Sequence, residues 1–526
     1  MSKKIKHIVV VGGGSSGWLT VCNLLYRISS LKNIKITLIE SKDIPIIGVG
    51  ESVTGKMWNC INHFDHLGDQ KEFLRETGST FKYGIQHIDW YEKGHSFLSP
   101  IGSTFVNETT YPTKDYDYIR ILHIAEKMKY LKPLQNRLMT ENKVYCVNGE
   151  PGNPYKDILG ENGFKEIHDF DVAYHIDAFE TSKYLRKKCI ATGRVDRLED
   201  TVSDILMNEN GGIKSLKLKS GVEVEADFFI DCSGWSRVLM NKVGAKFVSY
   251  KDNLLVNKAF VFPKPLEENE VMKNHTYITA REYGWTFEIQ LQNRTGRGYI
   301  FNGDMVDIDK AIDEVSNAYG EKIVPKKVLD FECGRIDKFW INNVLAVGLS
   351  SQFVEPMEAT AMHTTVSQID RFLEYYFTDN LDLYNKDLQN DYNEFMNSYM
   401  DDMRDFITFH YITPRNDTEF WRESSSEKRW SNELKQKMNI WKTRMPRVPD
   451  YNHKGRLHDI GNALWIQVGQ GMNLFDSEIA KKELEYYGLY ETAKKDLQGI
   501  SEFASYCCDR AMTTNEYFKN YLYENK

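Results

Sequence analysis

A short apolar run that ends directly on a glycine-rich turn constrains this chain more than any other feature. Residues Ile8–Val11 are typical of a buried strand, and Gly12-Gly13-Gly14-Ser15-Ser16-Gly17 follows them at once. We predict a helix over Trp18–Ile28. In such a turn the first glycine permits a sharp bend, the second lets backbone N–H groups approach a pyrophosphate, and the third lets the helix pack closely on the sheet. The sequence therefore predicts a dinucleotide-binding unit.

The next predicted strand ends on an acidic residue. This strand covers Ile34–Ile39, and Glu40 follows it. At this spacing from the glycines, a carboxylate accepts a hydrogen bond from a ribose hydroxyl and disfavours a 2′-phosphate. The order of the elements is strand, glycine-rich turn, helix, strand and acidic residue. This order indicates nucleotide binding far more specifically than the glycines alone.

Two later segments favour FAD over NAD as the nucleotide. A predicted antiparallel meander over residues 202–230, whose last strand covers 222–230, ends in Asp231-Cys232-Ser233-Gly234. Later, Val344–Val347 runs into Gly348-Leu349-Ser350-Ser351. Small residues at both strand ends would let the backbone approach one long cofactor beyond the carboxyl edge of the sheet. Taken singly, each segment is equally compatible with an ordinary turn. Because no second fingerprint for a nicotinamide dinucleotide follows, we expect electrons to arrive from a separate flavin reductase.

Composition excludes several classes of function. The 526 residues carry a net charge of −8, and no Lys/Arg cluster is interleaved with aromatic residues, so nucleic acid is not an expected partner. Apolar runs are too short to predict a membrane span. The eight cysteines show no C-x-x-C spacing, which indicates reduced thiols, no metal site and a cytoplasmic location.

Further motifs connect the chain to a known family. The chain resembles the flavin-dependent tryptophan halogenases over most of its length. The resemblance begins at the glycine-rich turn and continues through later motifs, which are Ile47–Ser52, Thr80–Ile85, Tyr174–Ala178, Phe229–Gly234, Gly348–Ser351, Phe353–Thr360, Asp401–Phe406, His410-Tyr411 and Arg415–Thr418 with Phe420-Trp421.

The resemblance implies a mechanism. In that family, reduced FAD (FADH2) reacts with O2 to give a C4a-hydroperoxide, halide attacks its distal oxygen, and hypohalous acid travels through a channel to the substrate. Lys82 would be the essential lysine and Glu358 its acidic partner. A lysine can hydrogen-bond hypohalous acid or form a haloamine, and a carboxylate can remove the ring proton. Without the resemblance, Lys82 reads as a solvated surface charge and Glu358 as an acid at a helix N-terminus.

The resemblance also implies the halide and cofactor sites. Two backbone amides after the glutamate bind halide in the family, and here they belong to Thr360 and Ala361. Alanine stands where the family usually has glycine and narrows the site, so we expect bromide or iodide to be favoured over chloride. The expected FAD-binding residues are Gly12, Gly14, Ser15, Ser16, Gly17, Glu40, Gly50, Glu51, Asp231, Gly234, Gly348 and Ser351.

The substrate side departs from the family pattern. Of the W-x-W-x-I-P marker, Trp285 and Ile289 remain, but Phe287 replaces the second tryptophan and Gln290 replaces the proline. This partial loss leaves hydroxylation open. Ser99 and Ile101 stand near the positions of the histidine and phenylalanine that sandwich the indole in tryptophan-specific members. His458 lies near a missing clamp tryptophan. We therefore expect an indole, a phenol or another electron-rich aromatic as substrate, and not free tryptophan.

These features predict an α/β (α+β) fold, with a Rossmann-type three-layer FAD-binding domain of the flavin monooxygenase/halogenase type, an added sheet and a mainly helical C-terminal substrate-binding cap. We expect the FAD module in residues 1–110, 165–240 and 330–380, the substrate-side sheet and helices in 111–164 and 241–329, and the cap in 381–526. The last residues, 516–526, are predicted to form a solvated tail. Whether the chain forms a homo-oligomer stays open.

Three functions compete at this stage. A flavin halogenase would need FADH2, O2 and halide. An aromatic hydroxylase would add oxygen to the ring without any need for halide. A non-catalytic flavin redox sensor would bind FAD and leave Lys82 and Glu358 without a role.

Overall fold

The computed structural model describes residues 4–28, 33–43, 50–54, 57, 70–101, 117–128, 133–147, 150–151, 173–447, 450, 452–453, 456–457 and 462–523. The chain forms two compact units. The first unit comprises residues 1–79, 176–251 and 332–402, and the second comprises 80–175, 252–331 and 403–526. Residues 80–110, expected in the FAD module, thus belong to the second unit, and residues 381–402, expected in the cap, belong to the first.

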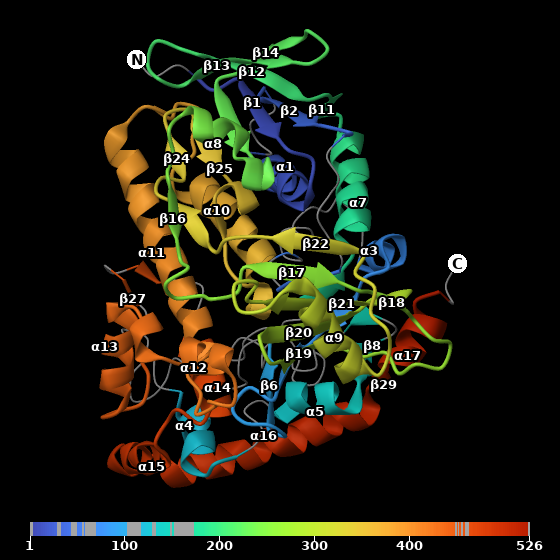
Figure 1. Ribbon diagram of the computed structural model, residues 1–526, viewed down its shortest axis with the longest axis vertical. Coiled ribbons are helices and arrows are strands. Elements are labelled where there is room, and N and C mark those ends of the chain that lie inside the picture. The colour runs from blue at the N-terminus through green and yellow to red at the C-terminus, as the bar shows by residue number, and fades with distance from the viewer. Residues whose placement is uncertain are drawn as a thin grey trace. The chain divides into compact units, whose positions relative to one another are not determined.

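A six-stranded sheet forms the centre of the first unit (Figure 1). The first five strands in this sheet run parallel, and the last is antiparallel to its neighbour. Parallel strands covered on both faces are apolar throughout, which is why the first strand reads as an unbroken hydrophobic run. The strand order is β11 (Val195–Glu199), β2 (Lys35–Glu40), β1 (His7–Val11), β15 (Phe228–Asp231), β25 (Val344–Ala346) and β24 (Trp340–Ile341).

Three helices of the first unit pack together beside this sheet. Helix α1 (Ser15–Arg27) contacts both α7 (Ala178–Ala191) and α10 (Thr360–Tyr375). Helix α11 (Lys386–His410) begins in the first unit and ends in the second. The other elements are β3 (Glu51–Ser52), α3 (Gln70–Thr77), β12 (Val202–Met207), β13 (Ile213–Leu218), β14 (Glu223–Glu225), η1 (Gly234–Ser236), α8 (Val238–Lys242), β16 (Phe247–Ser249), β23 (Gly334–Ile336), η2 (Gly348–Ser350), β26 (Gln352–Phe353) and η3 (Pro356–Glu358).

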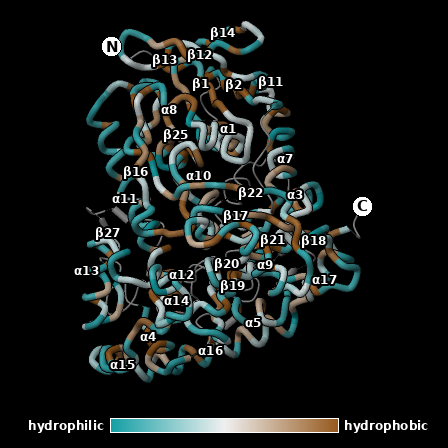
Figure 2. Tube along the Cα trace, in the orientation of Figure 1, coloured by the Kyte–Doolittle hydropathy of each residue, from teal (hydrophilic) through white to brown (hydrophobic). Residues whose placement is uncertain are grey.

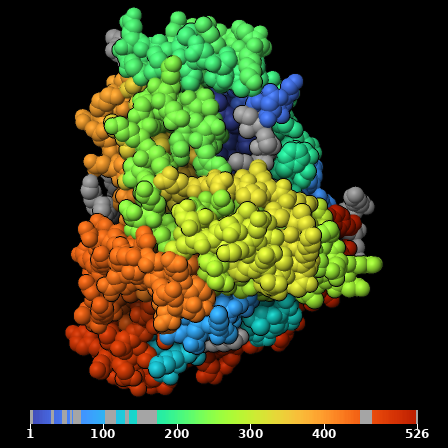
Figure 3. Space-filling view, in the orientation of Figure 1, coloured from blue at the N-terminus to red at the C-terminus, as the bar shows by residue number. Residues whose placement is uncertain are grey.

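An eight-stranded sheet forms the centre of the second unit. Its strands pair antiparallel except for β19 and β5, which run parallel. Figure 3 shows α9 (Ile308–Tyr319) and the neighbouring strands as a continuous yellow-green to yellow surface. The order is β22 (Lys327–Asp330), β17 (Lys258–Val261), β21 (Arg294–Phe301), β20 (Gly284–Gln290), β19 (Thr276–Ala280), β5 (Gly84–Ile88) and β6 (Ser96–Pro100), with β18 (Lys264–Pro265) also paired to β21.

The remainder of the second unit is mostly helical, as the sequence predicts for the C-terminal region. Helix α16 (Tyr490–Arg510) packs against α4 (Tyr118–Ala125) and α5 (Pro133–Glu141). The other elements are β4 (Thr80–Lys82), β7 (Lys143–Val144), β8 (Cys146–Val147), β9 (Glu150–Pro151), β10 (Ala173–Ile176), α12 (Glu419–Ser424), η4 (Glu427–Arg429), α13 (Asn432–Trp441), β27 (Asn452–His453), β28 (Arg456–Leu457), α14 (Asn462–Gly471), α15 (Ser477–Tyr486), β29 (Met512–Thr513), α17 (Thr514–Glu516) and η6 (Tyr517–Tyr521).

Hydrophobic residues collect in the central strands and on the inward stripes of the helices. Figure 2 shows β1 and β2 largely in the hydrophobic colour. On α11, the aromatic stripe of Phe395, Tyr399 and Phe406 is buried, so these side chains are core residues. Within the described residues, none of the helices is both long enough and apolar enough to cross a membrane.

The meander differs from its prediction at its last strand. The sequence predicts one strand over residues 222–230, but the structure divides it. Strand β14 pairs with β13, whereas β15 joins the central sheet parallel to β1. Asp227, between them, accepts hydrogen bonds from the backbone N–H groups of Lys6 (2.9 Å) and His7 (3.1 Å). This long-range contact lies where the chain leaves the meander and enters the central sheet. It could not be predicted from the local sequence.

The prediction of a solvated C-terminal tail is wrong for the described residues. Tyr517, Phe518 and Leu522 are buried. The rings of Tyr517 and Phe518 pack against Phe81, with centroid distances of 5.0 and 5.4 Å. Residue Phe81 lies directly before Lys82, so the end of the chain supports the strand that carries the predicted catalytic lysine. Burial of aromatic area outweighs the polar composition of the segment.

Candidate active site

Three loops meet at the carboxyl ends of neighbouring parallel strands in the first unit. The register pairs Val11 of β1 with Asp231 of β15, and Asp231 with Ala346 of β25. The glycine-rich turn, the Asp231–Gly234 segment and the turn at Gly348 therefore leave the sheet side by side. Open α/β sheets bind their ligands in this crevice. The structure thus brings together the three segments that the sequence singled out for the cofactor.

Several glycines in these loops occupy positions where a side chain would not fit. Gly12 has a φ of +118°, and a Cβ there would overlap the carbonyl oxygen of Cys232. A Cβ on Gly17 would overlap the carbonyl oxygen of Gly12, and one on Gly348 would overlap the hydroxyl of Ser16. A Cβ on Gly14, by contrast, would meet no heavy atom within 4 Å. The other glycines let the loops approach one another, and Gly14 leaves open space beside the backbone.

The N-terminus of α1 lacks a side-chain cap. Gly14 is the N-cap residue, and the first turn contains no acidic residue. Ser15 shares a 3.3 Å hydrogen bond with Ser182, and Ser16 shares one of 3.5 Å with Thr365. The uncapped N–H groups and the helix dipole favour an anion at this end of the helix.

Glu40 lies at the end of β2, directly against the glycine-rich turn. A Cβ on Gly13 would overlap its carboxylate. Arg197 and Arg186 both donate to Oε1 of Glu40, the latter at 3.4 Å. The two arginines hold a carboxylate in place at the position where the sequence predicts a ribose hydroxyl.

Asp231 shapes its loop from within. The buried carboxylate accepts four hydrogen bonds of 2.6–2.9 Å, from the backbone N–H and hydroxyl of Ser233 and from the N–H groups of Leu239 and Met240. Burial raises the pKa of Asp231 above its usual value. Both carboxylate oxygens are thus used in hydrogen bonds within the loop. Asp231 therefore fixes the loop that contains Gly234, whose φ is +69°.

Gln368 on α10 fixes the third loop, and sequence reasoning did not identify it. Its Oε1 accepts a 3.0 Å hydrogen bond from the N–H of Gly348, and its Nε2 donates to the hydroxyl of Ser351 at 2.8 Å. A glutamine within an ordinary helical stretch gives no signal of this role, because its partners precede it by 17 and 20 residues.

A carboxyl group with an unusual pKa follows the fourth predicted glycine. Gly50 has a φ of +115°, and Glu51 comes next. Burial, and then the charge of Asp177, raise the pKa of Glu51 to about 7. Asp177 itself caps α7 by accepting from the N–H groups of Phe179 (2.9 Å) and Glu180 (3.1 Å). Glu51 can therefore hold a proton near neutral pH and donate a hydrogen bond.

The predicted halide amides lie at the N-terminus of α10, a helix of 16 residues. Its N-cap residue, Ala359, has a φ of +59°, and its first turn contains no acidic residue. Thr360 and Ala361 supply the first backbone N–H groups. The buried Oγ1 of Thr360 has no hydrogen-bond partner within the described part of the chain. Glu358, half-buried at the end of η3, directly precedes this turn.

Lys82 is buried in the second unit, with an exposed fraction of 1%. It ends β4, where it pairs with Ala173 of β10, and Thr80 pairs with His175. His175 Nε2 shares a 2.8 Å hydrogen bond with Thr276 Oγ1. Burial, and then the charge of Lys82, lower the pKa of His175 well below its usual 6.5, so the ring is neutral beside the lysine. The structure excludes the interpretation of Lys82 as a solvated surface charge.

The end of β6 lies next to the segment that follows Lys82. Gly84 pairs with Pro100, and the N–H of Ile101 donates to the carbonyl oxygen of Tyr83 at 2.8 Å. Ser99 is buried. The second unit thus brings Lys82 and the predicted substrate residues Ser99 and Ile101 into one neighbourhood, whereas Glu358 belongs to the first unit.

The partly retained marker segment is part of an aromatic cluster. Trp285 on β20 is buried, with ring-centroid distances of 6.5 Å to Trp90 and 6.3 Å to Phe287. Gln290 donates to the carbonyl oxygen of Leu291 at 3.0 Å. The predicted residue His458 and the motif residues Ile47–Val49 lie outside the described residues.

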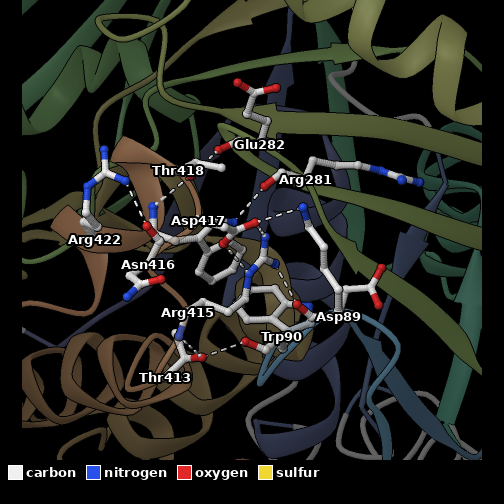
Figure 4. A network of polar contacts seen from close by, with 12 residues as sticks. Asp89, Trp90, Arg281, Glu282, Thr413, Arg415, Asn416, Asp417, Thr418 and Arg422 are labelled. Atoms are coloured by element: carbon white, nitrogen blue, oxygen red, sulfur yellow. Dashed lines mark hydrogen bonds and ion pairs between the residues drawn. The ribbon is translucent and has the colours of Figure 1, made fainter.

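The Arg415–Thr418 motif forms a charged network (Figure 4). Arg415 donates to both oxygens of Asp417 at 3.0 Å and stacks 4.2 Å from the ring centre of Trp421. Lys93 also pairs with Asp417 at 3.1 Å, and these groups lower the pKa of Asp417 to about 2. A pocket of about 540 Å³ opens here. None of the predicted site residues lines it.

The first unit fits the pyrophosphate and a ribose of a dinucleotide such as FAD. The uncapped N-terminus of α1 suits a pyrophosphate, the open space beside Gly14 leaves room for it, and Glu40 is fixed where a ribose hydroxyl would lie. These three observations come from the geometry of the loops.

Comparison with known proteins identifies the family. The sequence profile described as Tryptophan halogenase matches residues 7–480. The tryptophan 6-halogenase ThaL of Streptomyces albogriseolus is 28% identical over 466 residues, which cover 85% of this chain and 83% of ThaL. A tryptophan halogenase structure from Shewanella frigidimarina NCIMB 400 has a TM-score of 0.86 at 23% identity and covers 99% of this chain and 98% of its own. BrvH, a flavin-dependent halogenase from Brevundimonas sp. BAL3, has a TM-score of 0.81 at 24% identity and covers 98% and 99%. The chain belongs to the tryptophan halogenase family and is a flavin-dependent enzyme.

Proposed function

We propose that this enzyme halogenates an electron-rich aromatic ring, with reduced FAD, dioxygen and halide as co-reactants and Lys82 and Glu358 as the reacting side chains. The observation that carries the proposal is the burial of Lys82 beside the end of β6. Lysine is rarely buried without a specific partner or task, because removing an ammonium group from water costs free energy. The functions named for the relatives support the same reaction.

In this proposal, bound reduced FAD and dioxygen supply the oxidising equivalent that converts halide into hypohalous acid. The Lys82 ammonium donates a hydrogen bond to the oxygen of hypohalous acid and polarises the oxygen–halogen bond. When the ring carbon bonds to the halogen, that bond breaks and its electron pair stays with oxygen, which leaves as water after taking up a proton. The Glu358 carboxylate accepts the ring proton and restores aromaticity.

The halide would bind at the N-terminus of α10. The N–H groups of Thr360 and Ala361 point from the positive end of a long helix whose first turn lacks acidic residues. The methyl group of Ala361 narrows the site relative to glycine. We expect turnover with bromide or iodide to exceed turnover with chloride, which gives up its hydration shell less readily.

The substrate would be an indole or a phenol and not free tryptophan. Ser99 and Ile101 offer neither of the two rings that sandwich the indole in tryptophan-specific members. Efficient halogenation of free tryptophan at low concentration would contradict this part of the proposal.

Mass spectrometry tests the reaction class. The purified enzyme, reduced FAD, oxygen and bromide are incubated with a panel of aromatic compounds, and the bromine isotope pattern is sought in the products. Added oxygen without halide dependence would instead establish an aromatic hydroxylase, which the partial loss of the marker at Phe287 and Gln290 favours as the second candidate. Rapid reduction of FAD by NADH or NADPH with the purified chain alone would reject the need for a separate reductase.

A further inference from the structure

Helix α14 lies against one face of β6 in the second unit. Phe97 and Ser99 are two residues apart on the strand and share a face, and Gln467 and Gly471 are four residues apart on the helix and share a stripe. A Cβ on Gly471 would overlap the ring of Phe97, and Gln467 hydrogen-bonds Ser99. These two contacts fix the helix on the strand at the position where the sequence predicts the substrate.

The side-chain amide of Gln467 has a fixed orientation. Its Nε2 donates to the hydroxyl of Ser99 at 2.6 Å and to the carbonyl oxygen of Pro100 at 3.1 Å. A carbonyl oxygen can only accept, so the nitrogen of the amide must face Pro100. The amide oxygen, Oε1, therefore points away from the strand.

That oxygen lacks a donor. The Gln467 side chain is 1% exposed, and its Oε1 has no hydrogen-bond partner within the described residues. Buried polar atoms in proteins almost always have a partner, and an orphan marks a place for a water or ligand. Aromatic rings flank the contact between helix and strand: Phe97, which packs against Gly471, stacks on His87 with ring centroids 4.3 Å apart. An aromatic substrate with one polar hydrogen would supply the missing donor.

We infer that Gln467 determines substrate specificity by accepting a hydrogen bond from the substrate. The substrate class is then an aromatic ring that carries its own N–H or O–H donor, such as an indole or a phenol. Rings of the same shape without a donor would leave Oε1 unpaired and bind less well. The inference rests on the proposed function for the identity of the site, and on the geometry of Gln467 for the chemistry.

Calorimetric titration of the full chain, loaded with oxidised FAD and without reductant, tests the inference in the absence of turnover. Indole and benzofuran are the probes, since they have nearly the same shape and differ in the N–H donor. We expect indole to bind about three- to tenfold more tightly, as one hydrogen bond allows. Equal affinities, tighter binding of benzofuran, or no binding of indole would overturn the inference. This comparison needs no variant, so a folding defect cannot obscure it.

The variant Gln467→Met keeps the length of the side chain and removes the acceptor. It should abolish the preference, so that indole and benzofuran bind with about equal affinity. Gln470→Met is the matched control and should keep the preference. Gln470 lies on the same helix, and its amide oxygen also lacks a partner within the described residues, but its nitrogen donates to the carbonyl oxygens of His123 (3.4 Å) and Met128 (2.7 Å) and not to β6. A preference that survives in a folded Gln467→Met variant contradicts the inference. Bromination of indole is measured separately. If indole binds more tightly than benzofuran but is not brominated, the proposed function alone is rejected. If indole is brominated but binds no more tightly than benzofuran, this inference alone is rejected.

Discussion

The two units build their sites from different parts of the chain. In the first unit, the site is formed mainly by backbone conformation. Gly12, Gly17 and Gly348 allow three loops to approach one another at the edge of the parallel sheet. In the second unit, side chains from distant segments meet, with Lys82 near the end of β6 and Gln467 of α14 on Ser99. An unusual backbone conformation restricts which residues can occupy a position, so the first site is marked by a sequence motif. Side-chain packing tolerates many residue types, so the second site has a weaker sequence signal.

The largest expected effect is on the side-chain site. Lys82→Met keeps the length of the side chain and removes the ammonium group, and it should lower the rate of halogenation about a thousandfold, because polarisation of hypohalous acid is lost. Oxidation of reduced FAD by oxygen should continue, since the flavin residues belong to the first unit. Product and peroxide are quantified together. Lys322→Met, at an exposed lysine of the same unit, is the control. Normal turnover of Lys82→Met would reject the catalytic role.

The second prediction separates two glycines of one turn. Gly12→Ala places a Cβ at a φ of +118° against a carbonyl oxygen, so it should destabilise even the flavin-free protein by about 2–3 kcal/mol. Gly14→Ala meets open space, and it should change the stability of the flavin-free protein by about 1 kcal/mol or less while weakening FAD binding. Chemical denaturation and FAD titration measure the two effects. Equal effects of the two substitutions would show that the turn is not built as proposed.

The third prediction concerns pH and the first unit. The pKa of Glu51 is raised from 4.5 to about 7, so the folded state binds more protons than the unfolded state between these values. Stability of the flavin-free chain should therefore fall as pH rises through this window. Glu51→Gln removes the effect, and it should be more stable than the natural sequence at pH 8 by about 3 kcal/mol, with the difference vanishing below about pH 4.5. If the unfolding free energies of the natural sequence and of Glu51→Gln changed in parallel with pH, the raised pKa of Glu51 would be contradicted.

The smallest expected effect concerns the charged network of the second unit. Asp417→Asn removes the partner of Arg415 and Lys93, and it should cost about 1 kcal/mol at neutral pH, because the pair is partly exposed. The pKa of Asp417 is lowered from 3.8 to about 2, so its contribution is present above pH 4 and is lost as pH falls through about 2. Thermal unfolding over this range measures it. Glu209→Gln, in an exposed turn, should change little, and halogenation by Asp417→Asn should stay near normal.

Much of the first unit could be predicted from the sequence. The strand, turn and helix from His7 to Arg27 agree with the prediction within a few residues. The prediction fails where a distant contact decides, as at Asp227, which redirects the last strand of the meander, and at Tyr517, which packs against Phe81. Gln368 and Gln467 went unnoticed for the same reason, since an amide side chain carries no signal until its partners are known.

The nucleotide-binding turn and the resemblance to the flavin-dependent halogenases could be predicted from local sequence, because glycines at fixed spacing reflect conformations that other residues cannot adopt. Three features could not be predicted in this way: the burial of Lys82, the hydrogen bonds by which Asp231 holds its loop, and the amide oxygen of Gln467 that lacks a donor within the described residues. Burial and hydrogen-bond partners arise when segments far apart in the chain pack together, and local sequence does not encode which ones will meet.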